Sequence, residues 1–160
     1  MPVAIEFTVL GETQLQRVLM RFSARTLNAI PVFVQLMKAI ESQVEEQFDS
    51  EGARGSGGWD ELAPATIEFK RRNGYPLEIL HRTLTLRNSL TKTMAPGAIR
   101  RIDKQSMTFG SSVKYGIFHQ KGAPKANLPQ RRPVEFTESD RQDYATMIQR
   151  YVVTGKTMPV

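Results

Sequence analysis

The sequence predicts an α+β fold, in which long N-terminal helices and a C-terminal helix pack on a small, largely antiparallel sheet. Apolar residues recur at helical spacing in two segments near the N-terminus and in one near the C-terminus. Between them, short apolar segments alternate with glycine and proline turns, which is typical of short strands. The length of 160 residues and the hydrophobic share of 40% fit one domain. We therefore expect a single domain over residues 1–160.

The N-terminal part of the chain contains one predicted strand and two predicted helices. Residues 2–10 alternate between apolar and other side chains, which is the pattern of a half-buried strand. Residues 13–27 are expected to form a helix, and a longer helix is expected over residues 31–48, with Pro31 in its first turn. The apolar stripe of the first helix consists of Leu15, Val18, Leu19 and Phe22.

The middle of the chain begins with a glycine-rich segment. Residues 49–58 contain four glycines and two serines, so we expect a flexible loop that holds no residue of the core. Trp59 restarts the ordered structure and leads into a short helix that ends near Arg72. Residues 77–90 have a mostly helical apolar pattern, with Thr83 as a possible N-cap.

The C-terminal part is predicted to alternate short elements before a final long helix. Pro96 and Gly97 interrupt residues 92–101, which predicts two short strands around a turn. The elements expected after them are a strand over 106–111, a short helix over 115–120 that Gly122 closes, irregular chain over 123–132, a last strand at Val134 and Phe136, a helix over 138–153 and a tail over 155–160.

Residues that support catalysis or metal binding are scarce. The chain has no cysteine, which excludes disulfides, thiolate metal sites and cysteine nucleophiles. The two histidines, His81 and His119, do not stand at a metal-binding spacing, so a packing role is favoured for both. No serine stands in a GxSxG motif, and the glycine-rich segment lacks the lysine of a P-loop. We predict a protein that is not an enzyme and has no cofactor, with a dispersed-site hydrolase as the least favoured alternative.

Charge is distributed unevenly along the chain, which carries a net charge of +6. Residues 41–61 contain seven acidic residues and one basic residue, whereas residues 100–133 contain eight basic residues and one acidic residue. These two stretches either attract each other, within a chain or between chains, or form two solvated surfaces of opposite sign.

Basic residues also form three short clusters, at 70–72, 100–101 and 131–132, which are able to neutralise phosphates. No zinc finger, recognition helix or aromatic platform for RNA accompanies them. A non-specific nucleic-acid-binding accessory protein, in non-specific contact with DNA, is therefore the alternative function. The N-terminal residues lack the basic region of a signal peptide, and no apolar run reaches the length of a membrane span, so we expect no membrane contact.

Four segments over residues 58–136 resemble motifs of one protein family, in the order in which the family has them. They read GWDELAPATI at 58–67, LHRTLTLRNSL at 80–90, VKYGIFHQKG at 113–122 and LPQRRPV at 128–134. They are similar to the segments GxxWxPLSPAT, LLxTGxLRxSI, xxYAxIHQxG and IPARPFLG of the phage virion morphogenesis family, which includes tail-completion proteins of Mu-like phages. The chain departs from this pattern in the second segment, which lacks the family's glycine, and at residues 134–136, which replace the FLG ending.

The resemblance implies a structural virion protein of a tailed bacteriophage that acts in tail completion or head–tail joining. It implies an oligomeric, ring-like adaptor at the neck, connector or tail terminator, and it implies no catalysis. The partners that it implies are further copies of the chain and the neighbouring head–tail connector or tail proteins. The implied location is the virion, and the host cytoplasm during assembly.

A set of candidate interface residues follows from the charge pattern and the resemblance. We expect the acidic stretch of one subunit to face the basic stretch of its neighbour, with Arg131 and Arg132 paired to carboxylates. Trp59 is expected to anchor the glycine-rich segment, either to a neighbour or to the core of its own subunit. The candidate interface residues are Trp59, Leu62, Glu45, Glu46, Arg100, Arg101, Tyr115, His119, Arg131 and Arg132.

Overall fold

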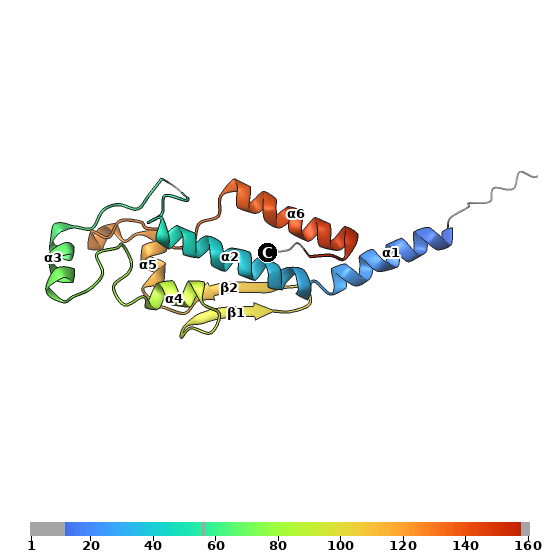
Figure 1. Cartoon of the computed structure of the whole chain (residues 1–160), viewed down its shortest axis with the longest axis horizontal. Coiled ribbons are helices and arrows are strands. Elements are labelled where there is room, and N and C mark those ends of the chain that lie inside the picture. The colour runs from blue at the N-terminus through green and yellow to red at the C-terminus, as the bar shows by residue number, and fades with distance from the viewer. Residues whose placement is uncertain (1–11, 56, 158–160) are drawn as a thin grey trace, which may run out of the picture.

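The computed structural model describes residues 12–55 and 57–157. Its elements, in chain order, are α1 (Glu12–Leu27), α2 (Ile30–Asp49), α3 (Pro64–Arg72), α4 (Thr85–Thr91), β1 (Ala98–Ile102), β2 (Met107–Ser111), α5 (Gly116–Lys121), the 3₁₀ turn η1 (Pro124–Ala126) and α6 (Glu138–Thr154). Figure 1 shows an elongated molecule in which α1 projects from one end and α3 lies at the other. Helix α2 runs along the body between α6 and the two strands. The predicted α+β class is therefore confirmed.

Helix α2 is built around apolar residues that stand four positions apart. The buried residues of this row are Val32, Leu36, Ile40, Val44 and Phe48. A spacing of four keeps side chains on one face of a helix, and this one contacts α4, α6 and β1. Pro31 lies in the first turn, where its missing N–H costs no hydrogen bond. The helix predicted over residues 31–48 is confirmed.

Strands β1 and β2 pair in antiparallel fashion, with Arg100 opposite Phe109. A sheet of two strands is marginally stable by itself, and the side chain of Arg100 ties this sheet to two helices. Its guanidinium donates to the carboxylate of Glu41 on α2 at 2.8 Å and to the carbonyl of Leu90 on α4 at 2.7 Å. It also lies 4.2 Å from the centroid of the Phe109 ring. Arg100 therefore acts as an internal clamp.

Two buried clusters, one at each end of α2, hold the helices together. In the larger one, the rings of Phe48 and Trp59 meet edge to face with centroids 5.6 Å apart, and Leu86 of α4 completes the cluster. The smaller one joins the start of α2 to Tyr151 of α6. The Tyr151 hydroxyl donates to the carbonyl of Asn28 at 2.8 Å, so that α6 is fixed at the junction of α1 and α2.

The glycine-rich segment 49–58 is anchored to the core at Gly52. The N–H of Gly52 donates to the carbonyl of Gln47 at 2.8 Å, and the N–H of Trp59 donates to the carbonyl of Glu51 at 2.7 Å. Gly52 is buried against the indole of Trp59, with a φ of +85°. The expectation that this segment holds no residue of the core is therefore wrong at Gly52, and its flexibility stays a prediction.

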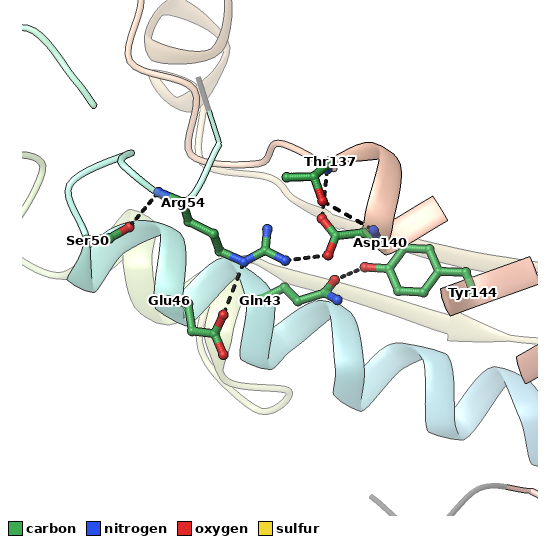
Figure 2. A network of polar contacts seen from close by, with 7 residues as sticks. All are labelled: Gln43, Glu46, Ser50, Arg54, Thr137, Asp140 and Tyr144. Carbon is green, nitrogen blue, oxygen red and sulfur yellow. Dashed lines mark hydrogen bonds and ion pairs between the residues drawn. The ribbon is translucent and has the colours of Figure 1, made fainter. Parts of the chain in front are cut away.

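Arg54 links the glycine-rich segment to two helices (Figure 2). Its guanidinium donates to Glu46 of α2 at 3.1 Å and to Asp140 in the first turn of α6. Asp140 also accepts the backbone N–H of Thr137 at 2.7 Å, and the Thr137 hydroxyl accepts the N–H of Asp140 at 3.2 Å. This reciprocal pair is a capping box, so the same carboxylate starts α6 and holds the segment in place.

The predicted helical pattern over residues 77–90 is wrong for its first half. Helix α4 begins at Thr85, because Leu80 and Leu84 have φ angles of 61° and 58°, in the left-handed region that a right-handed helix excludes. Leu84 stands at the N-cap, and the hydroxyl of Thr83 bonds that of Thr85 at 3.0 Å instead of capping the helix.

Two predicted strands are absent. Residues 92–97 hold turns instead of the first strand expected over residues 92–101, and Gly97, with a φ of 83°, brings the chain into β1. At Val134, the amide of Gln120 bonds both backbone groups, donating to the carbonyl at 2.8 Å and accepting the N–H at 3.2 Å. A side chain thus replaces the strand partner that these backbone groups would otherwise need.

The remaining predicted elements agree with the structure to within two residues, apart from the segment 2–10, which lies outside the described residues. The irregular stretch 123–132 contains η1. None of the helices in the described part of the chain is both long and apolar enough to cross a membrane.

Replacing Gly52 by alanine is expected to lower the free energy of unfolding more than replacing Gly57. Both glycines have a positive φ, of +85° and +92°, so each variant carries a backbone strain of about 1 kcal/mol. A Cβ at Gly52 collides with the indole of Trp59, whereas a Cβ at Gly57 meets nothing within 4 Å. We expect an additional loss of about 1–3 kcal/mol for G52A in urea unfolding. Equal losses in the two variants would contradict the packing of Trp59 on Gly52.

Asp140 is expected to make the stability depend on pH in acid. Burial raises the pKa of Asp140, but the hydrogen bonds from Arg54 and Thr137 outweigh burial and hold it below the ordinary value of 3.8. Its stabilisation is therefore complete above the unfolded-state pKa and is lost as the pH falls through the folded-state pKa. We expect Asp140→Asn to be less stable than the wild type near neutral pH and to lose less in acid, as measured by urea unfolding over a pH series. The control is Asp143→Asn, an exposed position on the same helix, and parallel curves for wild type and D140N would sink this prediction.

Candidate functional site

A groove of about 620 Å³ opens at the end of the molecule that carries α3 and α5. Its walls come from four separate stretches of the chain, within residues 62–70, 80–86, 115–119 and 127–131. Each stretch falls in or next to one of the four sequence segments at 58–67, 80–90, 113–122 and 128–134. Segments that are far apart in the sequence therefore build one surface.

Arg131 joins three of these four segments. Its side chain is buried, and the guanidinium donates to the carbonyls of Asp60 and Glu61, each at 2.8 Å. Its backbone N–H donates to the carbonyl of His119 at 2.9 Å. Hydrogen bonds from a charged donor are among the strong ones, and here they fix the chain that leads into α3. The position of the α3 wall therefore depends on Arg131.

Two further cations shape the wall between α3 and residues 77–82. The ammonium of Lys70 is buried and donates to the carbonyl of Glu78 at 2.7 Å, and burial lowers the pKa of Lys70. The guanidinium of Arg82 lies 5.2 Å from the ring centroids of both Phe69 and Tyr75, a cation–π contact. Both side chains stiffen the rim of the groove.

Helix α5 contributes two rings to the groove. Tyr115 and His119 meet edge to face with ring centroids 6.1 Å apart, and Tyr115 is 44% exposed. Burial, aided by the charge of Arg131, lowers the pKa of His119, so its imidazole is neutral at pH 7. Its Nδ1 atom is buried and has no hydrogen-bond partner among the described residues. The imidazole therefore has hydrogen-bonding capacity that the described residues do not use.

The chemistry of the lining favours binding. Apolar atoms make up most of the exposed lining, the charged side chains in the wall are cations, and no carboxylate takes part in the lining. Within the described residues, no group of three or more histidine, aspartate or glutamate side chains is arranged to hold a metal ion. The groove is suited to a segment that supplies apolar side chains and hydrogen-bond acceptors or carboxylates.

The structure distributes the ten candidate interface residues over three environments. The side chains of Trp59, Arg100 and Arg131 are buried and bonded within the chain; Leu62, Tyr115 and His119 line the groove; Glu45, Glu46, Arg101 and Arg132 lie on other surfaces. Trp59 packs in the core of its own chain, which is one of the two alternatives predicted for it. The indole N–H of Trp59 donates to the carbonyl of Arg132 at 3.3 Å. Contact of these residues with a partner stays a prediction.

The expected pairing of the acidic and basic stretches between subunits needs revision. Glu41 pairs with Arg100 in the same chain at 2.8 Å, and Glu45 pairs with Arg87 at 3.2 Å. Arg131, which was expected to bind a neighbour's carboxylate, donates to backbone carbonyls instead. The ion pair between Glu41 and Arg100 therefore joins the two stretches within the chain, whereas Arg87, the partner of Glu45, lies outside the basic stretch.

Several groove residues were not among the candidate interface residues: Leu80, Arg82, Thr83, Asn127 and Leu128. Only the fold brings these residues together. The signal that pointed to them was the set of four segments, to which all of them except Asn127 belong, because the groove is where these segments meet.

A family model for phage virion morphogenesis proteins matches residues 10–153, which is most of the chain. The chain belongs to the phage virion morphogenesis family. No curated protein and no solved structure matches it closely enough to add to this assignment. The family comprises structural and assembly proteins of phage virions and is not known for enzymatic activity.

Replacing Arg131 by methionine is expected to destabilise the fold, which tests the clamp. The variant leaves the carbonyls of Asp60 and Glu61 without their donors, at a cost of about 2–4 kcal/mol in the free energy of unfolding. Arg132→Met is the matched control, because Arg132 is exposed and its ion pair with Glu135, at 3.1 Å, is worth about 0–1 kcal/mol. A loss in R131M no larger than the loss in R132M would show that the clamp contributes little.

Proposed function

We propose that this protein completes the tail or joins head to tail in a tailed phage, as an oligomeric adaptor whose groove receives a neighbouring virion protein. One observation carries the proposal: the four segments that resemble the family line a single groove at one end of the molecule. Four stretches that share a family pattern and meet at one surface indicate a shared binding role for that surface.

The surface around the groove supports docking of a protein partner. On α5, Ile117 is 49% exposed and Phe118 is 53% exposed, next to the half-exposed ring of Tyr115. Exposed apolar side chains that gather in one place, with a polar rim, mark protein-binding surfaces. The cations in the wall favour a partner segment that carries carboxylates as well as apolar side chains.

The alternative of a nucleic-acid-binding accessory protein has less support. Each of the three basic clusters has one member with a buried side chain, namely Lys70, Arg100 or Arg131. These side chains donate to carbonyls or to a carboxylate of their own chain, so they do not reach phosphates. The remaining cations are spread over several surfaces, and non-specific DNA contact stays a secondary hypothesis.

The experiment that tests the role is deletion of the gene from the phage that encodes the chain, followed by electron microscopy of the products. We expect DNA-filled heads and tails that are not joined, or tails of abnormal length, and loss of infectious particles. Normal joined particles and a normal titre from the deletion phage would overturn the proposal.

Groove variants are expected to fail in this role while they remain folded. Thr83→Glu places a carboxylate at the groove, where it repels a partner segment that carries carboxylates, and Tyr115→Ser removes an exposed ring from the rim. In complementation of the deletion phage, we expect each to lower the titre of infectious particles by at least about tenfold, as the loss of a central interface contact does. Met94→Ser is the control, because Met94 is 93% exposed and does not line the groove. Equal titres for Y115S and M94S would contradict docking at the groove.

A further inference from the structure

Helix α1 presents an apolar face that nothing in the described chain covers. Leu15, Val18 and Leu19 are 59%, 42% and 56% exposed, and they stand three and four residues apart on one side of the helix. Neither buried cluster contains a residue of α1. The helix is attached near its C-terminal end, where Arg25 donates to the carbonyl of Val152 on α6 at 3.0 Å. An amphipathic helix that projects from the body in this way is suited to a groove on another molecule (Figure 1).

The charge of α1 restricts what its apolar face binds. Arg17 and Arg21 stand four residues apart on one side of the helix, beside the Val18 edge of the apolar face, and form no ion pair with any residue that the structure describes. Glu12 is the one carboxylate in the helix. The matching surface is therefore apolar at its centre and acidic at its rim.

The chain itself offers such a surface, at the end opposite to α1. A hollow of about 240 Å³ lies beside α3, with Ile67 and the 43% exposed Leu77 in its apolar lining. The exposed Glu61 lines it, and the exposed Glu78 stands between two lining residues; neither forms an ion pair among the described residues. Arg71 is the cation of this lining, and Glu51 adds a further carboxylate.

The groove described above is the wrong place for α1. Its wall carries Lys70, Arg82 and Arg131 and no carboxylate, so Arg17 and Arg21 would meet like charge there. In the lining of the hollow beside α3, carboxylates outnumber cations, with Glu51 and Glu61 against Arg71. Because α1 and α3 lie at opposite ends of the molecule, α1 does not reach the hollow of its own subunit.

We propose that α1 of one copy packs its apolar face into the hollow beside α3 of a second copy, with Arg17 and Arg21 facing Glu61 and Glu78. This contact joins two different surfaces, so each added copy exposes the same pair of surfaces again, and the chain of copies ends only by closing on itself. The inference rests on the proposed function, since it names the contact by which the adaptor forms its oligomer.

Light scattering behind a sizing column, over a dilution series of the purified full chain, tests the contact. We expect the wild type to form an oligomer that dissociates on dilution and in high salt. Arg17→Glu with Arg21→Glu, and separately Glu61→Arg with Glu78→Arg, are each expected to raise the dissociation constant by at least about tenfold. Combining all four changes is expected to restore association, because the charges are then exchanged. A wild type that is monomeric at every concentration, or a fourfold variant that stays dissociated, would overturn the inference.

The controls separate this contact from folding and from other surfaces. Lys38→Glu with Lys92→Glu makes the same charge change at two exposed lysines outside α1 and the hollow, and is expected to leave the oligomer intact. Leu15→Ser with Leu19→Ser is expected to dissociate it, whereas Met94→Ser, at a residue that is 93% exposed, is not. Circular dichroism checks that every variant is folded. If self-association survives the α1 changes, the contact is wrong, while particle morphology in the deletion phage still decides the proposed function independently.

Discussion

The guanidinium of Arg131 holds together the end of the molecule where the groove lies. That end contains little regular structure, so the carbonyls of Asp60 and Glu61 have no helix or strand partner. Arg131 supplies donors to both carbonyls in bonds that are partly shielded from solvent, while its own N–H bonds the carbonyl of His119. The chain that leads into α3, and with it one wall of the groove and the hollow on its other side, is held by this side chain together with Lys70 and Arg82.

Other cationic side chains likewise donate to the carbonyls of a neighbouring element. Arg100 donates to the carbonyl of Leu90, Arg25 to that of Val152, and Lys70 to that of Glu78. A sheet of two strands offers few ladder hydrogen bonds, so long cationic side chains take over part of their role. Several cationic side chains of this chain, which has a net charge of +6, therefore bond groups of the chain itself. A basic sequence stretch is for this reason a poor guide to phosphate binding here.

The sequence predicted those elements whose apolar residues repeat at helical spacing, such as α2, with its apolar row four residues apart, and α6. It failed where a single tertiary contact decides the backbone. Leu80 and Leu84 take left-handed angles that leucine disfavours, so their helical pattern is misleading. The strand expected at residues 134–136 is replaced by hydrogen bonds between the backbone of Val134 and the amide of Gln120. No local sequence pattern predicts these bonds. The groove was not predicted, although the four segments that line it were identified, because periodicity says nothing about which segments meet.

In the proposed arrangement, the two binding surfaces at the α3 end have opposite charge, and this keeps two kinds of contact apart. The hollow, with Glu61 in its lining, attracts the basic α1 of another copy, whereas the groove, with Lys70, Arg82 and Arg131 in its wall, repels it. Discrimination between two apolar surfaces requires such a repulsive element, because burial of apolar area alone is not selective. Self-association through the hollow therefore leaves the groove open for a partner of different charge. A copy that has joined the oligomer then presents the surface that the next virion protein binds, and oligomer formation does not compete with docking.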